Sequence, residues 1–268
     1  MNQKQHDDIR EQVRTSYTRV AEANNKGGCC GVESSCCGVS DDAKINTLIS
    51  TRLGYSADDI NNVPAGADMG LGCGNPKAIA NLKPGEVVID LGCGGGFDVF
   101  LAANEVGKNG KVIGIDMTPA MVSKARTNAE KAGYSNVEIR LGEIEHLPVA
   151  DNTADVIISN CVINLSPDKL QVFKDACRVL KPGGRLAISD VVASTELPDE
   201  IKRDKQLHSA CISGASTIDS LTQIMQQAGF IQIVINPKDE SREFIKDWSP
   251  GRNIEEYVMS ATIEAIKP

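Results

Sequence analysis

The chain has 268 residues, of which 41% are hydrophobic and only 4% aromatic, and its formal net charge is −8. This length suits one large α/β domain with a small appendage. The acidic balance excludes a non-specific nucleic-acid or anionic-lipid partner, and no apolar run approaches the roughly 18 to 20 residues of a membrane span. The polar N-terminus lacks a secretory apolar region, so we expect a soluble, cytoplasmic protein. Its nine cysteines are then free, metal-bound or redox-active.

The N-terminal part is expected to be mainly helical. Residues 5–25 and 41–53 carry apolar side chains at helical spacing, and Ser56 can cap a further helical turn. Between the first two helices, residues 26–40 contain GGCCGVESSCCG and form a loop. A glycine-rich loop around Cys73 follows, and Pro76 is placed to begin a short helix. We expect residues 1–68 to be a helical extension with a cysteine-rich loop.

From residue 86, short apolar strands alternate with helices. The expected strands cover residues 86–91, 111–117, 137–141, 154–160 and 184–192, with helices over 97–107, 118–133 and 166–182. This alternation predicts a doubly wound, Rossmann-like parallel sheet covered by helices on both faces, over residues 69–193. Residues 194–268 are expected to add sheet-edge strands and a small substrate-binding cap over the carboxyl ends of the main strands.

The segment DLGCGGG, residues 90–96, joins the first of these strands to its helix. Glycines let the backbone approach a ligand closely at the strand end where such folds bind nucleotides. Asp116 ends the next strand, about 20 residues further on, where a carboxylate can accept hydrogen bonds from ribose hydroxyls. Asp90 would repel a diphosphate but suits an ammonium and a sulfonium.

This D-x-G-x-G-x-G turn resembles the first motif of class I S-adenosylmethionine-dependent methyltransferases. The resemblance extends over roughly residues 84–192 through GEIEHLP, DNTADVIISN and RVLKPGG. It implies S-adenosylmethionine as cofactor, with its methionine part on Asp90 and its ribose on Asp116. The cofactor-binding residues that it implies are Asp90, Gly92, Cys93, Gly94, Asp116, Met117, Gly142, Glu143, Ile144 and Asn160.

Three cysteines follow or precede these segments at places where an acceptor pocket is expected. Cys161 ends the fourth strand in SNCVINL, Cys73 lies in GLGCGNP, and Cys211 lies in HSACISGAS. Three thiolates without histidine or carboxylate favour a soft ion, and the C-x-x-C spacing typical of structural zinc is absent from them. Trivalent arsenic takes three thiolates and keeps a lone pair opposite them. Cys93 and Cys177, in contrast, are expected to be small packing residues.

The segments GLGCGNP, SNCVINLSPDK, SDVVASTELPDEI and CISGAS together resemble the arsenite S-adenosylmethionine methyltransferases, over about residues 69 to 230. The chain departs from close relatives in having LGCG where they have YGCG. The resemblance implies methylation of arsenic(III), supplied as arsenite or methylarsenite and bound by Cys73, Cys161 and Cys211. Because the arsenic lone pair carries no proton, no general base is required.

The resemblance also implies a redox relay through a cysteine upstream of Cys73. We expect Cys36 or Cys37 to take this part, and a thiol reductant such as thioredoxin or glutathione to restore the enzyme. A flexible metalloid-binding tail that catalysis does not need is an equal alternative for this loop. For the whole chain, two alternatives stay open: a methyltransferase for a small organic acceptor such as a quinone, and a thiol-based metalloid sequestration protein.

Overall fold

The computed structural model describes residues 3–22 and 42–268. Within them, seven strands form one sheet in the order β3-β2-β1-β4-β5-β7-β6. The first five strands are β1 (Val87–Leu91), β2 (Lys111–Asp116), β3 (Val137–Leu141), β4 (Ala154–Asn160) and β5 (Leu180–Ala193), and they pair with one another in parallel. The strand order reverses beside β1, where β2 pairs on one side and β4 on the other. The doubly wound sheet expected from the sequence is confirmed.

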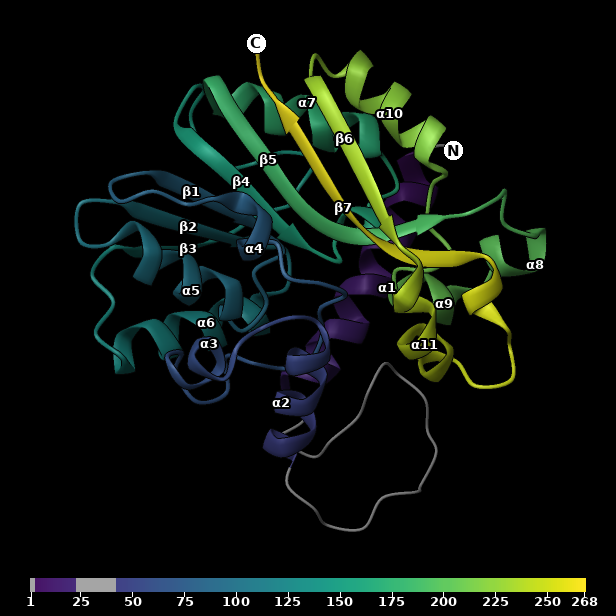
Figure 1. The fold of residues 1–268 in the computed structure, drawn as a ribbon, viewed down its shortest axis with the longest axis horizontal. Helices are drawn as coiled ribbons and strands as arrows, with labels where there is room; N and C mark the ends of the chain where they lie inside the picture. Colours follow the sequence, from purple (N-terminus) through teal and green to yellow (C-terminus); the bar gives the residue numbers. More distant parts are fainter. Residues whose placement is uncertain (1–2, 23–41) are drawn as a thin grey trace.

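Helices cover both faces of this sheet because the strands are apolar on both sides (Figure 1). Helices α5 (Phe97–Val106) and α6 (Pro119–Lys131) pack on one face, where Phe100 shares a core with Val88 and Val156. Helices α7 (Lys169–Val179) and α10 (Ile218–Gln227) pack on the other, where Phe173 meets Ile89. Successive strand residues point to opposite faces, so neighbours such as Val88 and Ile89 serve different cores.

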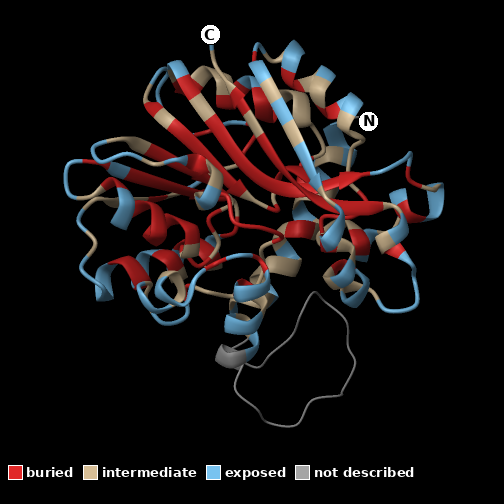
Figure 2. Ribbon diagram, in the orientation of Figure 1, coloured by how far each residue is buried: buried red, intermediate tan, exposed pale blue. Residues whose placement is uncertain are grey.

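The C-terminal part completes the sheet instead of forming a separate layer. β7 (Val258–Ile266) lies between β5 and β6 (Ile231–Lys238) and pairs antiparallel with both. β6 is an edge strand, as expected for this region, and its outer positions are exposed, as Figure 2 shows. β7 is not an edge strand, because it is paired on both sides and nearly all its residues are buried.

Seven further helices, most of them short, complete the fold of the described residues. The N-terminal part of the chain forms α1 (Gln3–Glu22), α2 (Asp42–Arg52), α3 (Ala57–Asn61) and α4 (Lys77–Ala80). The C-terminal part forms α8 (Asp199–Lys202), α9 (Lys205–Ser209) and α11 (Arg242–Ile245). Single 3₁₀ turns occupy η1 (Ile163–Leu165), η2 (Asp239–Ser241), η3 (Lys246–Trp248) and η4 (Ile254–Glu256). None of the helices in the described ranges combines the length and apolar character that a membrane span requires.

The N-terminal helices follow the sequence expectation closely. Ser56 caps α3 through a capping box with Asp59, whose backbone N–H donates to the Ser56 hydroxyl at 3.0 Å. The loop between α1 and α2, with Cys29, Cys30, Cys36 and Cys37, lies outside the described residues.

Candidate active site

A pocket opens at the carboxyl edge of the sheet, where the strand order reverses. Its wall contains the turn after β1, the residues that follow β2, the loop after β3 and the end of β4. Eight of the ten residues that the sequence indicated for the cofactor line it: Asp90, Gly92, Cys93, Gly94, Asp116, Met117, Ile144 and Asn160. The other two, Gly142 and Glu143, lie beside this wall.

The backbone of the glycine turn adopts conformations that disfavour side chains, and at Gly92 a side chain would also clash. Gly92 has φ +71°, and a Cβ there would lie 2.3 Å from Cγ2 of Val162. Gly94 also has a positive φ, and its backbone N–H donates to the Asp116 carboxylate at 3.0 Å. The turn therefore presents bare backbone to the pocket and is fixed from behind by Asp116.

Four buried carboxyl groups line the pocket, of which Glu145 is paired with Arg10 and the other three make the pocket acidic. Asp90, Asp98 and Asp116 are 3%, 7% and 8% exposed. Burial raises the pKa of all three: that of Asp98 to about 6, and that of Asp90, which also faces Asp98 and Asp116, well above its usual range. A cation in this pocket would relieve the mutual repulsion of the carboxylates, so the site fits a ligand with an ammonium or sulfonium centre.

Asn160 connects the glycine turn with the loop that carries Cys73. Its side-chain nitrogen donates to Asp98 at 3.1 Å, to the Gly74 carbonyl at 2.9 Å and to the Tyr55 hydroxyl at 3.0 Å. Its oxygen accepts from the Cys73 backbone N–H at 3.0 Å. One side chain at the end of β4 thus positions both the cofactor side and the cysteine side of the site.

Asp98 and Tyr55 belong to this site, although the sequence did not indicate them. The Tyr55 hydroxyl donates to Asp98 at 2.6 Å. Asp98 had a usable signal, since it is an acid in the first turn of the helix that the glycines open. Tyr55 had none, because it lies far upstream and reaches the pocket only through the tertiary fold.

The structure brings Cys73, Cys161 and Cys211 together from three separate segments. They are 1%, 6% and 2% exposed and belong to one buried cluster. The Cys211 thiol donates to the Cys161 carbonyl oxygen at 2.7 Å, and the Cys73 thiol donates to the Ser189 carbonyl oxygen at 3.5 Å. Cys161 also lines the pocket. Its sulfur lies within 4.8 Å of the Cys73 sulfur, whereas Cys211 reaches Cys161 through the carbonyl oxygen, so the cysteine cluster lies directly behind the cofactor wall. Cys93 and Cys177 pack in other clusters.

Two of the three cysteines have strained backbones. Cys161 has φ +60° and Cys211 has φ +63°, in the left-handed region that non-glycine residues occupy at a cost of about 1 to 3 kcal/mol. Backbone hydrogen bonds hold both: Cys161 N–H donates to Ser189 at 2.8 Å and Cys211 N–H to His208 at 3.0 Å. Such strain is concentrated at functional sites, which supports a role for these thiols beyond packing.

The thiols of the free site are neutral. Burial raises the pKa of Cys73 to about 11. The hydrogen bond with Cys161, together with burial, raises the pKa of Cys211 well above its usual range. The pKa of Cys161 is also raised well above its usual range. The interaction with Cys211 lowers this pKa, but the interaction with Cys73 and burial raise it by more. A ligand that binds here must therefore accept or displace three protons.

A carboxylate also lies at the three-cysteine site, which corrects the expectation of thiols alone. Ligand atoms of Cys73, Cys161 and Asp190 all lie within 4.8 Å of one another. Asp190 accepts from the Ile163 and Val191 N–H groups at 2.8 and 2.7 Å and from the Asn164 amide at 2.8 Å. Burial raises its pKa to about 6. It lies near the end of β5, beside the end of β4, and the sequence alone did not indicate that this carboxylate would lie beside the thiols.

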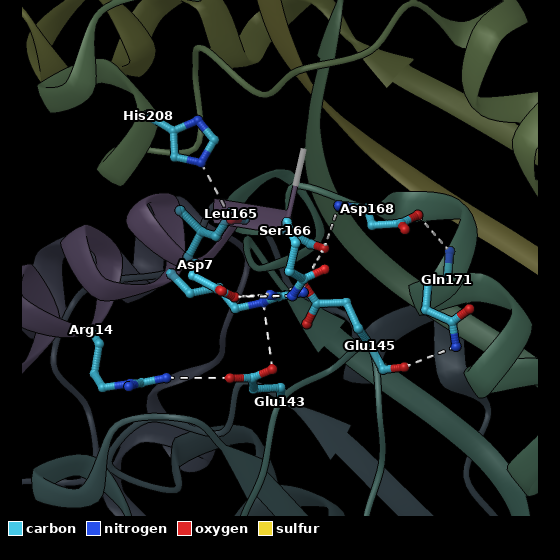
Figure 3. Close-up of polar contacts among 11 residues, drawn as sticks. Asp7, Arg14, Glu143, Glu145, Leu165, Ser166, Asp168, Gln171 and His208 are labelled. Carbon is cyan, nitrogen blue, oxygen red and sulfur yellow. Dashed lines mark hydrogen bonds and ion pairs between the residues drawn. The ribbon is translucent and has the colours of Figure 1, made fainter. Parts of the chain in front are cut away.

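Helix α1 closes the pocket from the side of the loop after β3. Arg10 pairs with Glu145 at 3.2 Å and Glu143 at 3.5 Å, and Arg14 pairs with Glu143 at 3.3 Å. Figure 3 shows Arg14 opposite Glu143, and Ser166 beside Glu145, to which it donates at 2.7 Å. Since Arg10 itself lines the pocket, α1 is part of the site wall and the Glu143 carboxylate is turned toward it.

Arg10→Gln is expected to lower the free energy of unfolding by about 1 to 3 kcal/mol, because the Glu145 side chain is only 4% exposed and would lose its charged partner. Guanidinium unfolding curves measure the change. Arg19→Gln, on an exposed position of the same helix, should stay within about 0.5 kcal/mol. Equal stability of the two variants would contradict the docking of α1 on this loop.

The glycine turn, the acidic partner after β2 and the acidic pocket at the reversal of the strand order define a class I S-adenosylmethionine-dependent methyltransferase. In agreement, residues 82–229 match the family described as a methyltransferase domain. The chain is 52% identical over 274 residues to the arsenite methyltransferase of Halobacterium salinarum, covering 98% of this chain and 67% of that protein. It belongs to the arsenite methyltransferase family.

Further relatives agree with this assignment. The arsenite methyltransferase of Aquipseudomonas alcaligenes is 43% identical over 166 residues, which cover 59% of this chain and 47% of that protein. The chain thus spans about two thirds of one curated relative and about half of the other. The crystal structure of an arsenic(III) S-adenosylmethionine methyltransferase from Chlamydomonas reinhardtii superposes with a TM-score of 0.63 at 31% identity, covering 82% of this chain and 73% of that one.

Proposed function

We propose that this chain transfers the methyl group of S-adenosylmethionine to arsenic(III) held by Cys73, Cys161 and Cys211. The observation that carries the proposal is that three buried cysteines from separate segments share one cluster and that one of them, Cys161, lines the cofactor pocket. A small organic acceptor would not need this arrangement. A sequestration protein would not need the acidic pocket beside it.

The residues present fit the cofactor. S-adenosylmethionine, when bound, supplies an electrophilic methyl group on a sulfonium. Asp90 and Asp98 would face its cationic methionine part, and Asp116 has lone pairs left for the ribose after accepting from Gly94 and Thr118. Met117 and Ile144 offer apolar surface for the base.

The binding of arsenic by the three thiols requires no external base. Arsenous acid, As(OH)₃, reacts with three neutral thiols to form three As–S bonds, and each thiol proton leaves with a hydroxyl group as water. This stoichiometry suits thiols whose pKa is high. The bound arsenic keeps its lone pair, and the fixed thiols hold it in one place. Such positioning can contribute roughly 7 to 11 kcal/mol of rate acceleration.

The affinity for S-adenosylmethionine is expected to rise about tenfold between pH 5 and pH 7. The cation favours ionised Asp98, whose pKa in the free protein is raised by burial to about 6, so binding weakens as pH falls through that value. Isothermal titration calorimetry at several pH values measures this. Asp98→Asn should flatten the profile, and an affinity that stays constant in the wild type would contradict the role of this carboxyl group.

The direct test is methyl transfer from methyl-labelled S-adenosylmethionine to arsenite with excess glutathione. Labelled methylarsenicals are the expected product. Label recovered in an added quinone without arsenite would favour the organic-acceptor alternative. Arsenite binding without cofactor binding would favour sequestration.

We propose the remaining parts of the cycle from chemistry. Methylation oxidises arsenic to the pentavalent state, so two electrons must come from thiols. Cys37 in the loop outside the described residues, and a reductant such as thioredoxin or glutathione, would supply them. In this assignment residues 1–68 take part in redox exchange and cover the site. Residues 69–193 bind the cofactor, and residues 194–268 complete the arsenic site.

A further inference from the structure

Lys169 is a partly buried lysine that the methyl transfer does not use. It is the first residue of α7, directly after the N-cap Asp168. Its ammonium donates to the Asn164 side-chain oxygen at 2.6 Å, to the Gly214 carbonyl at 2.5 Å and to the Ser216 hydroxyl at 2.7 Å. An ammonium has three donors, so every N–H of Lys169 has a partner.

These partners belong to the segments that carry two of the three cysteines. Asn164 lies in the turn just after Cys161, and its amide donates to the Val191 carbonyl at 2.6 Å as well as to Asp190. Gly214 and Ser216 follow Cys211 in the cap. Lys169 therefore joins the turn after Cys161 to the loop after Cys211.

The two segments are also in direct contact. A Cβ on Gly214 would lie 2.0 Å from the Asn164 carbonyl oxygen, so only glycine allows this approach. The contact places two carbonyl oxygens, of Asn164 and Gly214, in one small region. The Lys169 ammonium can only donate hydrogen bonds. It donates to oxygen atoms of this junction and thereby offsets the repulsion between them.

Burying the positive charge of Lys169 is unfavourable by itself. Burial lowers the pKa of Lys169 to about 8, although Asp190 and Cys211 act in the opposite direction. A buried ammonium is retained when its bonds compensate for lost hydration. Here all the bonds go to the junction and none to the rest of α7.

We propose that Lys169 is a positioning residue for arsenic binding, which holds the Cys211 loop against the turn after Cys161 and thereby places the third thiol. The inference rests on the proposed function of the cysteines. It assigns to Lys169 the placement of Cys211 and not that of Cys73, whose loop is held instead by Asn160 and by the Ser260 hydroxyl, 2.7 Å from the Cys73 carbonyl.

The test uses phenylarsine oxide, an arsenical that binds two thiols, in the full chain with Cys29, Cys30, Cys36 and Cys37 replaced by serine. Adding Cys73→Ser leaves the pair Cys161 and Cys211, whereas adding Cys211→Ser leaves Cys73 and Cys161. Lys169→Met should weaken binding by about tenfold or more in the first background and by less than about twofold in the second. Equilibrium dialysis gives both dissociation constants.

Each outcome bears on one claim. Equal weakening in both backgrounds, or no weakening in either, overturns the proposal, because a general structural role does not distinguish the pairs. Failure of phenylarsine oxide to bind either background with Lys169 intact contradicts the proposed function instead. Lys174→Met, on an exposed position of the same helix, is the matched control and should change neither constant. If Lys169→Met does not fold, Ser216→Ala removes one of the three bonds and should give a smaller change in the same direction.

Discussion

Cys161→Ser is expected to reduce methyl transfer to arsenite at least about a hundredfold while leaving S-adenosylmethionine affinity within about twofold. Serine has nearly the same shape, but its oxygen is a hard ligand that binds trivalent arsenic far less well than sulfur. Loss of one ligand displaces the acceptor atom, and a displacement of about 1 Å can cost about a hundredfold in rate. Cys161 is also the cysteine that lies close to both others, since its sulfur is within 4.8 Å of the Cys73 sulfur and its carbonyl oxygen accepts from the Cys211 thiol.

Two measurements separate this effect from unfolding. Cofactor affinity by calorimetry reports whether the pocket survives, and the label assay reports transfer. Cys177→Ser is the control, because Cys177 lies on α7 and packs against the core between this helix and the sheet, outside the site. Wild-type methyl transfer to arsenite by Cys161→Ser would contradict the assignment of Cys161 as an arsenic ligand.

Asp116→Asn is expected to weaken S-adenosylmethionine binding by about ten- to a hundredfold. The Asp116 carboxylate accepts from the Gly94 N–H at 3.0 Å and the Thr118 N–H at 2.8 Å. An amide has only one oxygen, so its NH₂ group would face a donor, either of the glycine turn or of the ribose. Lost charge-assisted hydrogen bonds are worth about 1.5 to 3 kcal/mol.

Calorimetry on the purified variant measures this affinity. Asp219→Asn, on an exposed position at the start of α10, should leave it unchanged. Unaltered binding by Asp116→Asn would mean that the ribose lies elsewhere, and the orientation of the cofactor would have to be revised.

The local sequence pattern was sufficient to predict most strands of the sheet. Buried parallel strands are continuous runs of apolar, β-branched residues, so the five strands of the first part could be predicted, and with them the strand ends where Asp90, Asp116, Asn160 and Cys161 lie. The exception was β7, whose residues are equally apolar. Its place between β5 and β6 depends on pairing with strands far away in the sequence, which no local pattern specifies.

The same distinction applies to the site. Glycines and acids at strand ends have fixed places in such a fold, and eight of ten cofactor residues were therefore found on the pocket wall. Glu143 was among the predicted residues, but its ion pairs with α1 were not foreseen, and neither was that of Glu145, which Arg10 meets across 135 positions of sequence. Asp190 was missed for a related reason, because the sequence does not reveal which carboxylate the ends of neighbouring strands place beside a thiol.

The four bonds of Asn160 have a consequence for thermal motion. The methyl group and the arsenic atom must stay aligned to within a fraction of an ångström while the molecule fluctuates. Because the same amide fixes Asp98 on one side and the Cys73 backbone on the other, a displacement of the β4 end moves the donor cradle and the acceptor loop in the same direction. We therefore expect the separation of the two parts to fluctuate less than the position of either part.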